Sequence, residues 1–373
     1  MNTCFIPFKY GVGLDIGKDT LHACVSAIDQ LQQTKIKATR SFTNTAKGIA
    51  DFLQWVDHHC KDHQLPVQYL MEATGVYHEQ VALALHRQQA QVSVILPQKA
   101  AHYLKALGIK TKTDGVDAQG LAMMACQQRL EVWKPISEAM HKLRQVTRQH
   151  TQIQEFKTQL NNQLISLEAG MYQSSEIRTQ LLHLLAQLDQ QLAECVKLIE
   201  KTIAENADWQ RKVAQICQIK GVGMLTVASL ITETNEFSLF ENHRQLTSYA
   251  GYDVVANQSG KRVGKTRISK RGNSRIRRTL HMPALLVVRY EQRPFRNLFE
   301  RVYGRTAIKM KGYVAVQRKL LTIIYSLWKK DEAYRVDYKS EGQKKVAPMP
   351  GATRHQPQEV VLENLNIELL VES

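Results

Sequence analysis

The distribution of apolar and polar positions in the first third of the chain predicts short strands alternating with helices. Three strand patterns come first, and helical spacing then alternates with two short buried strands that end near proline. The predicted strands cover 11–17, 21–28, 36–42, 67–71 and 92–96, and the predicted helices cover 45–60 and 76–89. Hairpin-like strands followed by alternating helix and strand are typical of an α/β layer with a mixed sheet. We therefore predict an α/β domain over residues 8–132.

The next region, residues 137–207, has apolar residues at heptad spacing in two stripes separated by Gly170, with Gln, Lys and Glu between them. The first stripe consists of Leu143, Val146, Ile153, Leu160, Leu164 and Leu167; the second of Leu181, Leu185, Leu188, Leu192, Val196, Ile199 and Ile203. This pattern predicts two long coiled-coil helices, either folded back on each other or paired between subunits. Two plain bundle helices without a role in assembly fit the pattern equally well.

Residues 208–335 have a mainly helical pattern that is interrupted by one basic, glycine-dotted stretch. We expect a mainly α C-terminal domain there. Residues 336–373 are polar and contain proline up to Pro357, which predicts a poorly ordered tail that ends in a short strand or helix.

Charge identifies the class of partner. The 373-residue chain has a formal net charge of +16, and such an excess attracts polyanions, nucleic acid first among them. The plainer explanation is a basic but otherwise ordinary soluble protein. No signal peptide or membrane-length apolar run is visible, so we expect a cytoplasmic protein without a membrane partner. Six scattered cysteines without a CxxC pair argue against a zinc knuckle and for reduced thiols.

Four carboxylates are candidates for a functional site because of their positions in the predicted strands and helix. Asp15 interrupts the first strand between Leu14 and Ile16, and Glu72 ends a later apolar strand. Asp114 and Asp117 are three residues apart, so they share one face of a helix capped by Thr113. We expect strand centre, strand end and helix start to converge at one edge of the sheet.

Four hard oxygen ligands suit two divalent cations, Mg²⁺ or Mn²⁺, at a phosphodiester-cleaving site. Taken singly, each residue also has an ordinary structural explanation. Asp114 fits a helix N-cap, and Asp15 fits a turn before Gly17. The ordered set of four favours the catalytic interpretation.

Two later segments are candidates for holding phosphate. The turn formed by Lys220, Gly221 and Gly223 has the spacing of a helix-hairpin-helix motif, whose backbone N–H groups can bind a DNA phosphate, although a tight structural turn is as good an explanation. The second segment, residues 261–278, has nine cations and no acid, and its plain explanation is a solvated basic face. The nine are Lys261, Arg262, Lys265, Arg267, Lys270, Arg271, Arg275, Arg277 and Arg278.

Three acidic motifs resemble one family. They are Gly13-Leu-Asp-Ile-Gly-Lys-Asp-Thr-Leu21, Met71-Glu-Ala-Thr-Gly-Val-Tyr77 and Lys112-Thr-Asp-Gly-Val-Asp-Ala118. They are similar to motifs of the DEDD transposases of the insertion-sequence one-ten family and of the related Piv-type DNA invertases. The resemblance implies a ribonuclease-H-like N-terminal domain of the RuvC type, in which Asp15, Glu72, Asp114 and Asp117 bind metal.

The family's C-terminal motif has a Gly, a Pro three residues later and then Ser-Gly. Gly251 and Ser259-Gly260 match this motif, whereas Val254 stands where Pro is expected, a departure that affects the local turn. By this resemblance Ser259 is the nucleophile that forms a phosphoserine link to DNA. From the residues alone, a turn serine before Gly260 is the better interpretation, since no Ser-His-Asp spacing points to Ser259.

The resemblance covers about residues 10–335 and implies a site-specific transposase or recombinase of a bacterial insertion sequence. It also implies nucleoid-associated double-stranded DNA as substrate, a noncoding bridge RNA as guide, and a homodimer or homotetramer. Three alternatives stay open at this point. They are a Piv-like invertase, a RuvC-like junction resolvase that uses metal and water alone, and a nucleic-acid-binding protein with an inactive nuclease fold.

Overall fold

The computed structural model describes residues 5–62, 64–73, 75–108, 113–255, 258–259, 262–263 and 267–335; for 258–259 and 262–263 only the backbone is described. The chain divides into two compact units, Met1–Pro135 and Ile136–Ser373, which we treat separately. The tail expected over 336–373 lies outside the described residues.

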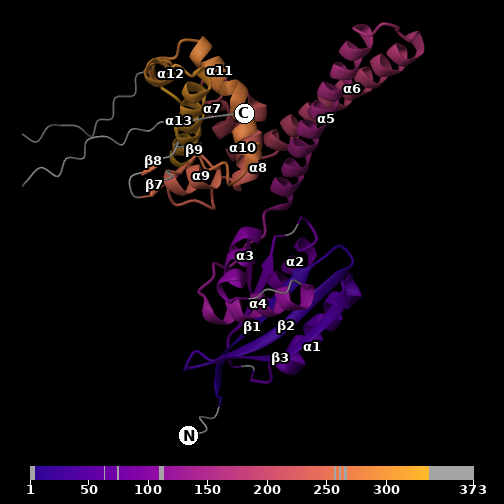
Figure 1. The fold of residues 1–373 in the computed structure, drawn as a ribbon, viewed down its shortest axis with the longest axis vertical. Coiled ribbons are helices and arrows are strands. Elements are labelled where there is room, and N and C mark those ends of the chain that lie inside the picture. Colours follow the sequence, from indigo (N-terminus) through magenta and orange to yellow (C-terminus); the bar gives the residue numbers. More distant parts are fainter. Residues whose placement is uncertain are drawn as a thin grey trace, which may run out of the picture. The chain divides into compact units, whose positions relative to one another are not determined.

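The N-terminal unit is built on a five-stranded mixed sheet with the order β3-β2-β1-β4-β5 (Figure 1). Strands β1 to β3 are antiparallel neighbours, whereas β4 is parallel to β1 and β5 to β4. This arrangement confirms the predicted ribonuclease-H-like α/β domain. The elements are β1 (Pro7–Ile16), β2 (Thr20–Asp29), β3 (Thr34–Thr43), α1 (Ala46–His59), β4 (Val67–Glu72), α2 (Glu79–Arg87), β5 (Gln91–Ile95), α3 (Pro97–Ala106) and α4 (Asp114–Gln127).

Both faces of the central strand β1 are covered, which explains why its sequence is almost continuously apolar or small. Its even-numbered residues, Tyr10, Val12, Leu14 and Ile16, belong to one core cluster with residues of α1 and α2. Its odd-numbered residues face α4. A Cβ atom at Gly13 would lie 2.2 Å from the Ala118 carbonyl oxygen, and one at Gly11 would lie 2.4 Å from the Ala122 carbonyl oxygen. Glycine at these two positions therefore lets α4 lie directly on the sheet.

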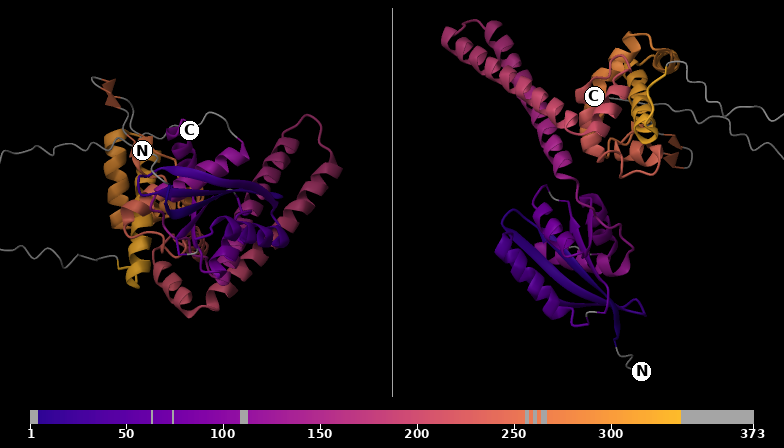
Figure 2. Two further views of the ribbon diagram at one scale, coloured as in Figure 1. Left: turned by 90° about the horizontal axis from the view of Figure 1, so that it is seen from below. Right: turned by 180° about the vertical axis from the view of Figure 1, so that it is seen from behind.

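The C-terminal unit begins with two long helices, α5 (Glu138–Glu168) and α6 (Ser175–Ala204), which pack along each other as a hairpin (Figures 1 and 2). The turn between them contains Gly170, where the apolar stripes are interrupted. Seven residues of the stripes are buried: Leu143, Ile153, Leu181, Leu185, Leu192, Ile199 and Ile203.

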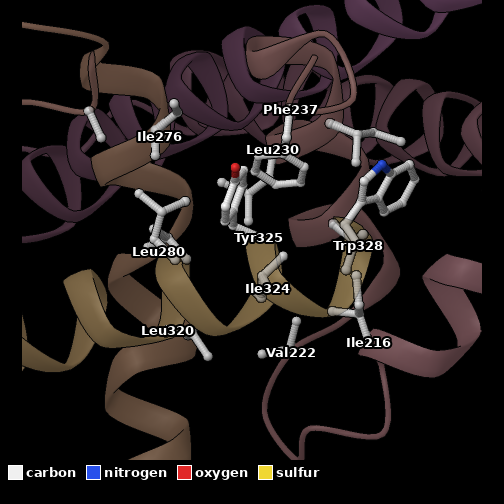
Figure 3. Packing of buried hydrophobic residues seen from close by; sticks show 14 of the residues in the cluster. Ile216, Val222, Leu230, Phe237, Ile276, Leu280, Leu320, Ile324, Tyr325 and Trp328 are labelled. Atoms are coloured by element: carbon white, nitrogen blue, oxygen red, sulfur yellow. The ribbon is translucent and has the colours of Figure 1, made fainter. Parts of the chain in front are cut away.

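The remaining helices form a bundle around α13, whose Ile324, Tyr325 and Trp328 lie at the centre of the core in Figure 3. Phe237 packs against Tyr325 in an edge-to-face arrangement with ring centroids 5.7 Å apart. The elements are α7 (Ala207–Ile216), α8 (Met224–Thr234), α9 (His243–Tyr249), α10 (Ser274–Thr279), α11 (His281–Arg289), α12 (Arg293–Thr306) and α13 (Lys309–Lys330). No helix in the described part of the chain is long and apolar enough to cross a membrane.

The basic stretch, which was expected to interrupt the helices, contains short strands together with the residues just before it. The four two-residue strands are β6 (Val254–Val255), β7 (Gln258–Ser259), β8 (Arg262–Val263) and β9 (Arg267–Ile268). Strand β6 pairs with β9, and β7 pairs with β8, both in antiparallel register. The two pairs are nested, so the stretch folds back on itself in the manner of a hairpin.

Candidate functional site

The register of the sheet brings Asp15 and Glu72 together. Strands β1 and β4 are parallel, and Leu14 lies opposite Met71, so the next step of the register places Asp15 beside Glu72. Side chains in register on parallel strands point to the same face. The prediction that Asp15 occupies a strand centre was wrong, because β1 ends at Ile16 and Asp15 is its last residue but one. Both acids therefore lie where their strands end, on the face that α4 covers.

The packing of α4 brings the other two acids to the same place. The helix crosses β1 so that Ala122 lies over Gly11, and Ala118 lies over Gly13. The next residue of β1 on the same face after Gly13 is Asp15, and the turn of α4 that precedes Ala118 is the first turn of the helix. Asp114 and Asp117, in the first turn of α4, are thereby brought over Asp15.

The start of α4 is well defined locally. The Thr113 hydroxyl accepts a hydrogen bond from the Val116 backbone N–H at 3.4 Å, as the sequence predicted for an N-cap. The helix dipole favours carboxylates in this first turn. Asp114 is thus the first helical residue rather than the cap, and the capping explanation for its carboxylate does not hold.

The electrostatics of Asp15 show that the four carboxylates form one group. Burial raises the pKa of the Asp15 carboxyl above its ordinary value, and the negative charges of Asp114, Asp117 and Glu72 raise it further, in that order. Such mutual repulsion is typical of sites that a cation neutralises.

Two residues that sequence reasoning missed lie in the same row across the sheet. His22 on β2 is opposite Asp15, and Ser41 on β3 is opposite His22. The Ser41 hydroxyl and His22 Nδ1 are 2.8 Å apart in a hydrogen bond, and His22 Nε2 lies 3.3 Å from an Asp114 carboxylate oxygen. His22 also lowers the pKa of Asp15, in opposition to the neighbouring acids. Pairing the first two predicted strands across the turn at Gly17 would have placed His22 there.

The donor set fits a divalent cation in its chemistry. Four carboxylates supply the hard oxygen atoms that Mg²⁺ and Mn²⁺ prefer, and their mutual repulsion is relieved by positive charge. As they stand, no three His, Cys, Asp or Glu residues in the described ranges are arranged to hold a metal ion. The Asp114 side chain is 67% exposed and lies beside His22.

The C-terminal unit contains the second candidate centre. Ser259, on β7, pairs with Arg262 on β8. Positions 260 and 261 between them lie outside the described residues, as do the side chains of Ser259 and Arg262 and the whole of Lys265. The nesting of the two strand pairs therefore places the Ser259 backbone near the turn of the basic stretch.

The structure divides the described cations of the basic stretch into two groups. Arg277 donates to the Ala250 carbonyl at 2.8 Å, and Arg278 forms an ion pair with Glu155 of α5. Arg277 is half-buried and supports the fold of the unit, whereas Arg278 stays 62% exposed in its ion pair. Arg267, Lys270, Arg271 and Arg275 are exposed as well. These four, which make neither of the two contacts with Ala250 and Glu155, are the better candidates for phosphate.

A buried carboxylate, also missed by sequence reasoning, supports this stretch. Glu233 on α8 accepts two hydrogen bonds from Arg148 of α5, at 2.7 and 3.1 Å, and one from the Asn273 amide at 2.8 Å. Burial raises the pKa of Glu233, but these hydrogen bonds outweigh burial and hold the pKa below its ordinary value. The Asn273 side-chain oxygen caps α10, so Glu233 orients the cap of the helix that carries Arg275.

The Lys220–Gly223 turn joins α7 to α8, and packing explains one of its glycines. Gly221 has a φ of +102°, and a Cβ atom there would lie 2.8 Å from the Leu286 Cβ. Gly223 has nothing within 4 Å of its Cβ position and caps the start of α8. Gly223, next to the exposed Lys220, is therefore the part of the turn that a phosphate can approach.

Comparison with known families gives the classification. A family model of DEDD transposases of the IS110 type matches residues 12–173, and the model of the IS116/IS110/IS902 transposase family matches residues 213–300. The chain belongs to the IS110 family of transposases. The first match contains all four carboxylates of the N-terminal site, and the second contains Ser259 and the basic stretch.

Several proteins similar to this IS110-family chain are known. The pilin gene-inverting protein of Moraxella bovis is 28% identical over 330 residues, which cover 87% of this chain and 98% of that protein. The counterpart from Moraxella lacunata has the same identity and coverage. The transposase for insertion sequence element IS1111A of Coxiella burnetii is 26% identical over 151 residues, which cover 39% of this chain and 40% of that protein. A structure of T. thermophilus RuvC in complex with Holliday junction substrate matches 31% of this chain and 90% of that chain, with 14% identity and a TM-score of 0.24.

Proposed function

We propose that this chain cuts and rejoins DNA strands as the site-specific transposase of an insertion sequence. The observation that carries this proposal is the gathering of Asp15, Glu72, Asp114 and Asp117 over one edge of the sheet, where their charges act on one another. Membership of a DEDD transposase family supports it. A fold alone would not, because one fold serves many functions.

The four carboxylates would hold two divalent ions, Mg²⁺ or Mn²⁺. When bound, these ions would supply Lewis-acid polarisation of the scissile phosphate. The protein's own part is to bring the ligands to one edge of the sheet. The sheet register positions Asp15 and Glu72, while the Gly13 contact and the Thr113 cap position the start of α4.

Ser259 would be the nucleophile. Its Oγ forms a bond to the phosphorus while the bond from phosphorus to one sugar oxygen breaks. The hydroxyl proton leaves Ser259, and the departing sugar oxygen takes up a proton. Rejoining is the same step in reverse. The exposed Arg267, Lys270, Arg271 and Arg275 would bind the phosphates on either side and stabilise the charge of the transition state.

The two centres lie in different units and would act together, within one chain or between the subunits of a homodimer or homotetramer. A noncoding bridge RNA that pairs with target and donor DNA would give the complex its sequence specificity. The net charge of +16 suits the binding of both nucleic acids.

A site-specific invertase is the second candidate, since the two pilin gene-inverting relatives align over 87% of the chain. An invertase flips a segment between inverted sites, whereas a transposase moves its own element. Sequencing the DNA junctions that the protein produces in cells separates the two functions.

Metal removal tests the proposal directly. The full chain, with its copurified nucleic acid, is incubated with labelled DNA from both flanks of its own gene. We expect cleaved DNA covalently attached to protein in Mg²⁺, and none in EDTA. Strand cleavage that persists in EDTA would exclude the metal site. Sequencing the copurified nucleic acid should give one discrete RNA; random fragments would exclude the RNA guide.

His22 is expected to position Asp114 for metal. His22→Ala should weaken Mn²⁺ binding by about tenfold, the lower end of the usual effect of removing a partner that orients a metal ligand. Calorimetric titration of the full chain with Mn²⁺ measures the effect. His58→Ala, an exposed histidine on α1, is the matched control and should bind as the wild type does. Equal affinities for the two variants would show that His22 does not orient the ligand.

A further inference from the structure

Helix α12 has a strongly basic surface of its own, separate in sequence from the basic stretch at residues 261–278. Residues 289–309 contain six Lys or Arg and two Glu. Both acids are engaged by Arg296, whose guanidinium lies 2.6 Å from the Glu291 carboxylate and 2.7 Å from that of Glu300. The two carboxylates of this segment are therefore occupied by a single arginine.

Three other arginines of α12 lie along one exposed stripe. Arg293, Arg301 and Arg305 are separated by multiples of four residues, and all three are exposed. At about 1.5 Å of rise per residue, the stripe is about 18 Å long. The Arg305 side chain lies back along the helix and donates to the Arg301 carbonyl at 3.4 Å.

The stability of the helix does not explain these residues. Like charges four residues apart, as at Arg301 and Arg305, destabilise a helix. Gly304 lies between them, in the last turn of α12, where alanine is the better helix former. A Cβ atom at Gly304 would meet nothing within 4 Å, whereas one at Gly312 would lie 2.6 Å from the Phe299 ring. Packing thus requires glycine at 312 but not at 304.

The end of the helix makes the contrast sharper. Ala307, its C-cap, has a φ of +55°, the left-handed conformation that glycine adopts more readily. The chain thus has alanine where the backbone favours glycine, and glycine where it favours alanine. Residues that contradict local structural preference without a packing reason are typical of functional surfaces.

The stripe continues to the Lys220–Gly223 turn. Gln292, the N-cap residue of α12, is buried and donates its side-chain amide to the Lys220 carbonyl. Lys220 is one partner of this hydrogen bond and Arg293 directly follows the other, so the hydrogen bond holds the two cationic residues near each other. An exposed series of cations runs from the turn, past Arg293, to Arg305.

We propose that this series, Lys220 with Arg293, Arg301 and Arg305 around the open backbone at Gly304, is a second binding surface for a sugar–phosphate backbone. Guanidinium groups bind phosphate through two N–H donors, and the missing side chain at 304 lets a strand approach the helix closely. This surface goes beyond the proposed function, which assigns phosphate contacts to Arg267, Lys270, Arg271 and Arg275 of the basic stretch.

A salt titration tests the surface. The affinity of the full chain for a duplex DNA and for a structured RNA of equal length is measured in EDTA by fluorescence anisotropy. Each phosphate that the protein no longer neutralises should reduce the slope of log affinity against log salt by about 0.9 for duplex DNA. R301Q/R305Q should therefore reduce that slope by about 1.8 and weaken binding at least tenfold. Weaker binding of one probe alone identifies that nucleic acid, and weaker binding of both identifies the shared backbone.

The matched control is K197Q/K201Q, which removes two exposed charges from α6 and should leave the slope unchanged. Gly304→Gln separates binding from folding. It should raise the melting temperature by about 2 °C, because it improves the helix, and yet weaken binding. A Gly304→Gln chain that binds as the wild type does, or an arginine variant that matches the lysine control, would overturn this surface alone. A wild-type chain that binds neither probe would overturn the proposed function as well.

Discussion

Asp15→Asn is expected to abolish metal-dependent DNA cleavage while making the N-terminal unit more stable in the absence of metal. Asparagine keeps the shape of the side chain but loses the negative charge that a cation needs. Loss of the metal's stabilisation of the transition state should reduce the cleavage rate by about 10³-fold or more. The same substitution removes the carboxylate that Asp114, Asp117 and Glu72 repel. Stability should therefore rise by about 1 kcal/mol, the typical size of relieving one unfavourable local interaction.

The direction of the Asp15 pKa shift predicts how the stability difference between the two proteins changes with pH. The pKa of Asp15 is raised in the folded chain, so its favourable contribution to stability is full at low pH and is lost as pH rises through the folded pKa. The free energies of unfolding of the wild type and of Asp15→Asn should therefore differ least in acid and most at neutral pH. Thermal melts of both proteins across this range, with and without Mn²⁺, measure the difference. Added Mn²⁺ should stabilise the wild type more than the variant.

Asp51→Asn is the control, since this exposed aspartate on α1 lies outside the acidic group. It should change neither cleavage nor the response to Mn²⁺. Full cleavage by Asp15→Asn would remove Asp15 from the metal site. Destabilisation of Asp15→Asn at neutral pH would contradict the repulsion that defines the site.

The fold of the N-terminal unit could be predicted because it follows from local patterns of apolar, polar and turn residues in the sequence. Alternation along each strand and turn residues between strands depend on neighbours in sequence. The strand that carries Asp15 was predicted over 11–17, but β1 starts at Pro7 and ends at Ile16. Only the pairing with β2, which extends back to Pro7, shows this earlier start, and the earlier start leaves Asp15 near the end of the strand.

What sequence reasoning missed depends on contacts between distant segments. Glu233 looks like the one charged residue of an otherwise uncharged helix, and its partner Arg148 is 85 residues away. Similarly, nine cations in eighteen residues looked like one phosphate-binding set. The structure shows that Arg277 holds a backbone carbonyl and that Arg278 pairs with Glu155. Spacing alone cannot show which of these cations contacts a distant segment of the chain.

Ser259→Ala is expected to eliminate covalent protein–DNA adducts while leaving noncovalent DNA binding intact. Removing the nucleophile of a covalent mechanism typically lowers the rate by about 10⁴-fold or more. The loss of one hydroxyl near the turn of the basic stretch leaves Arg267, Lys270, Arg271 and Arg275 in place. Denaturing gels of labelled DNA measure the adduct, and anisotropy measures the binding.

Ser274→Ala is the matched control because Ser274 is also exposed among cations, at the start of α10, and should keep full adduct formation. The decisive comparison is between cleavage and adduct in Ser259→Ala. Cleavage without an adduct would make water the nucleophile, and the chain would then act as a metal-dependent resolvase. Loss of both, together with an Asp15→Asn/Ser259→Ala double variant no worse than either single one, would place the carboxylates and the serine in the same chemical step, because effects of groups that act as a unit do not add.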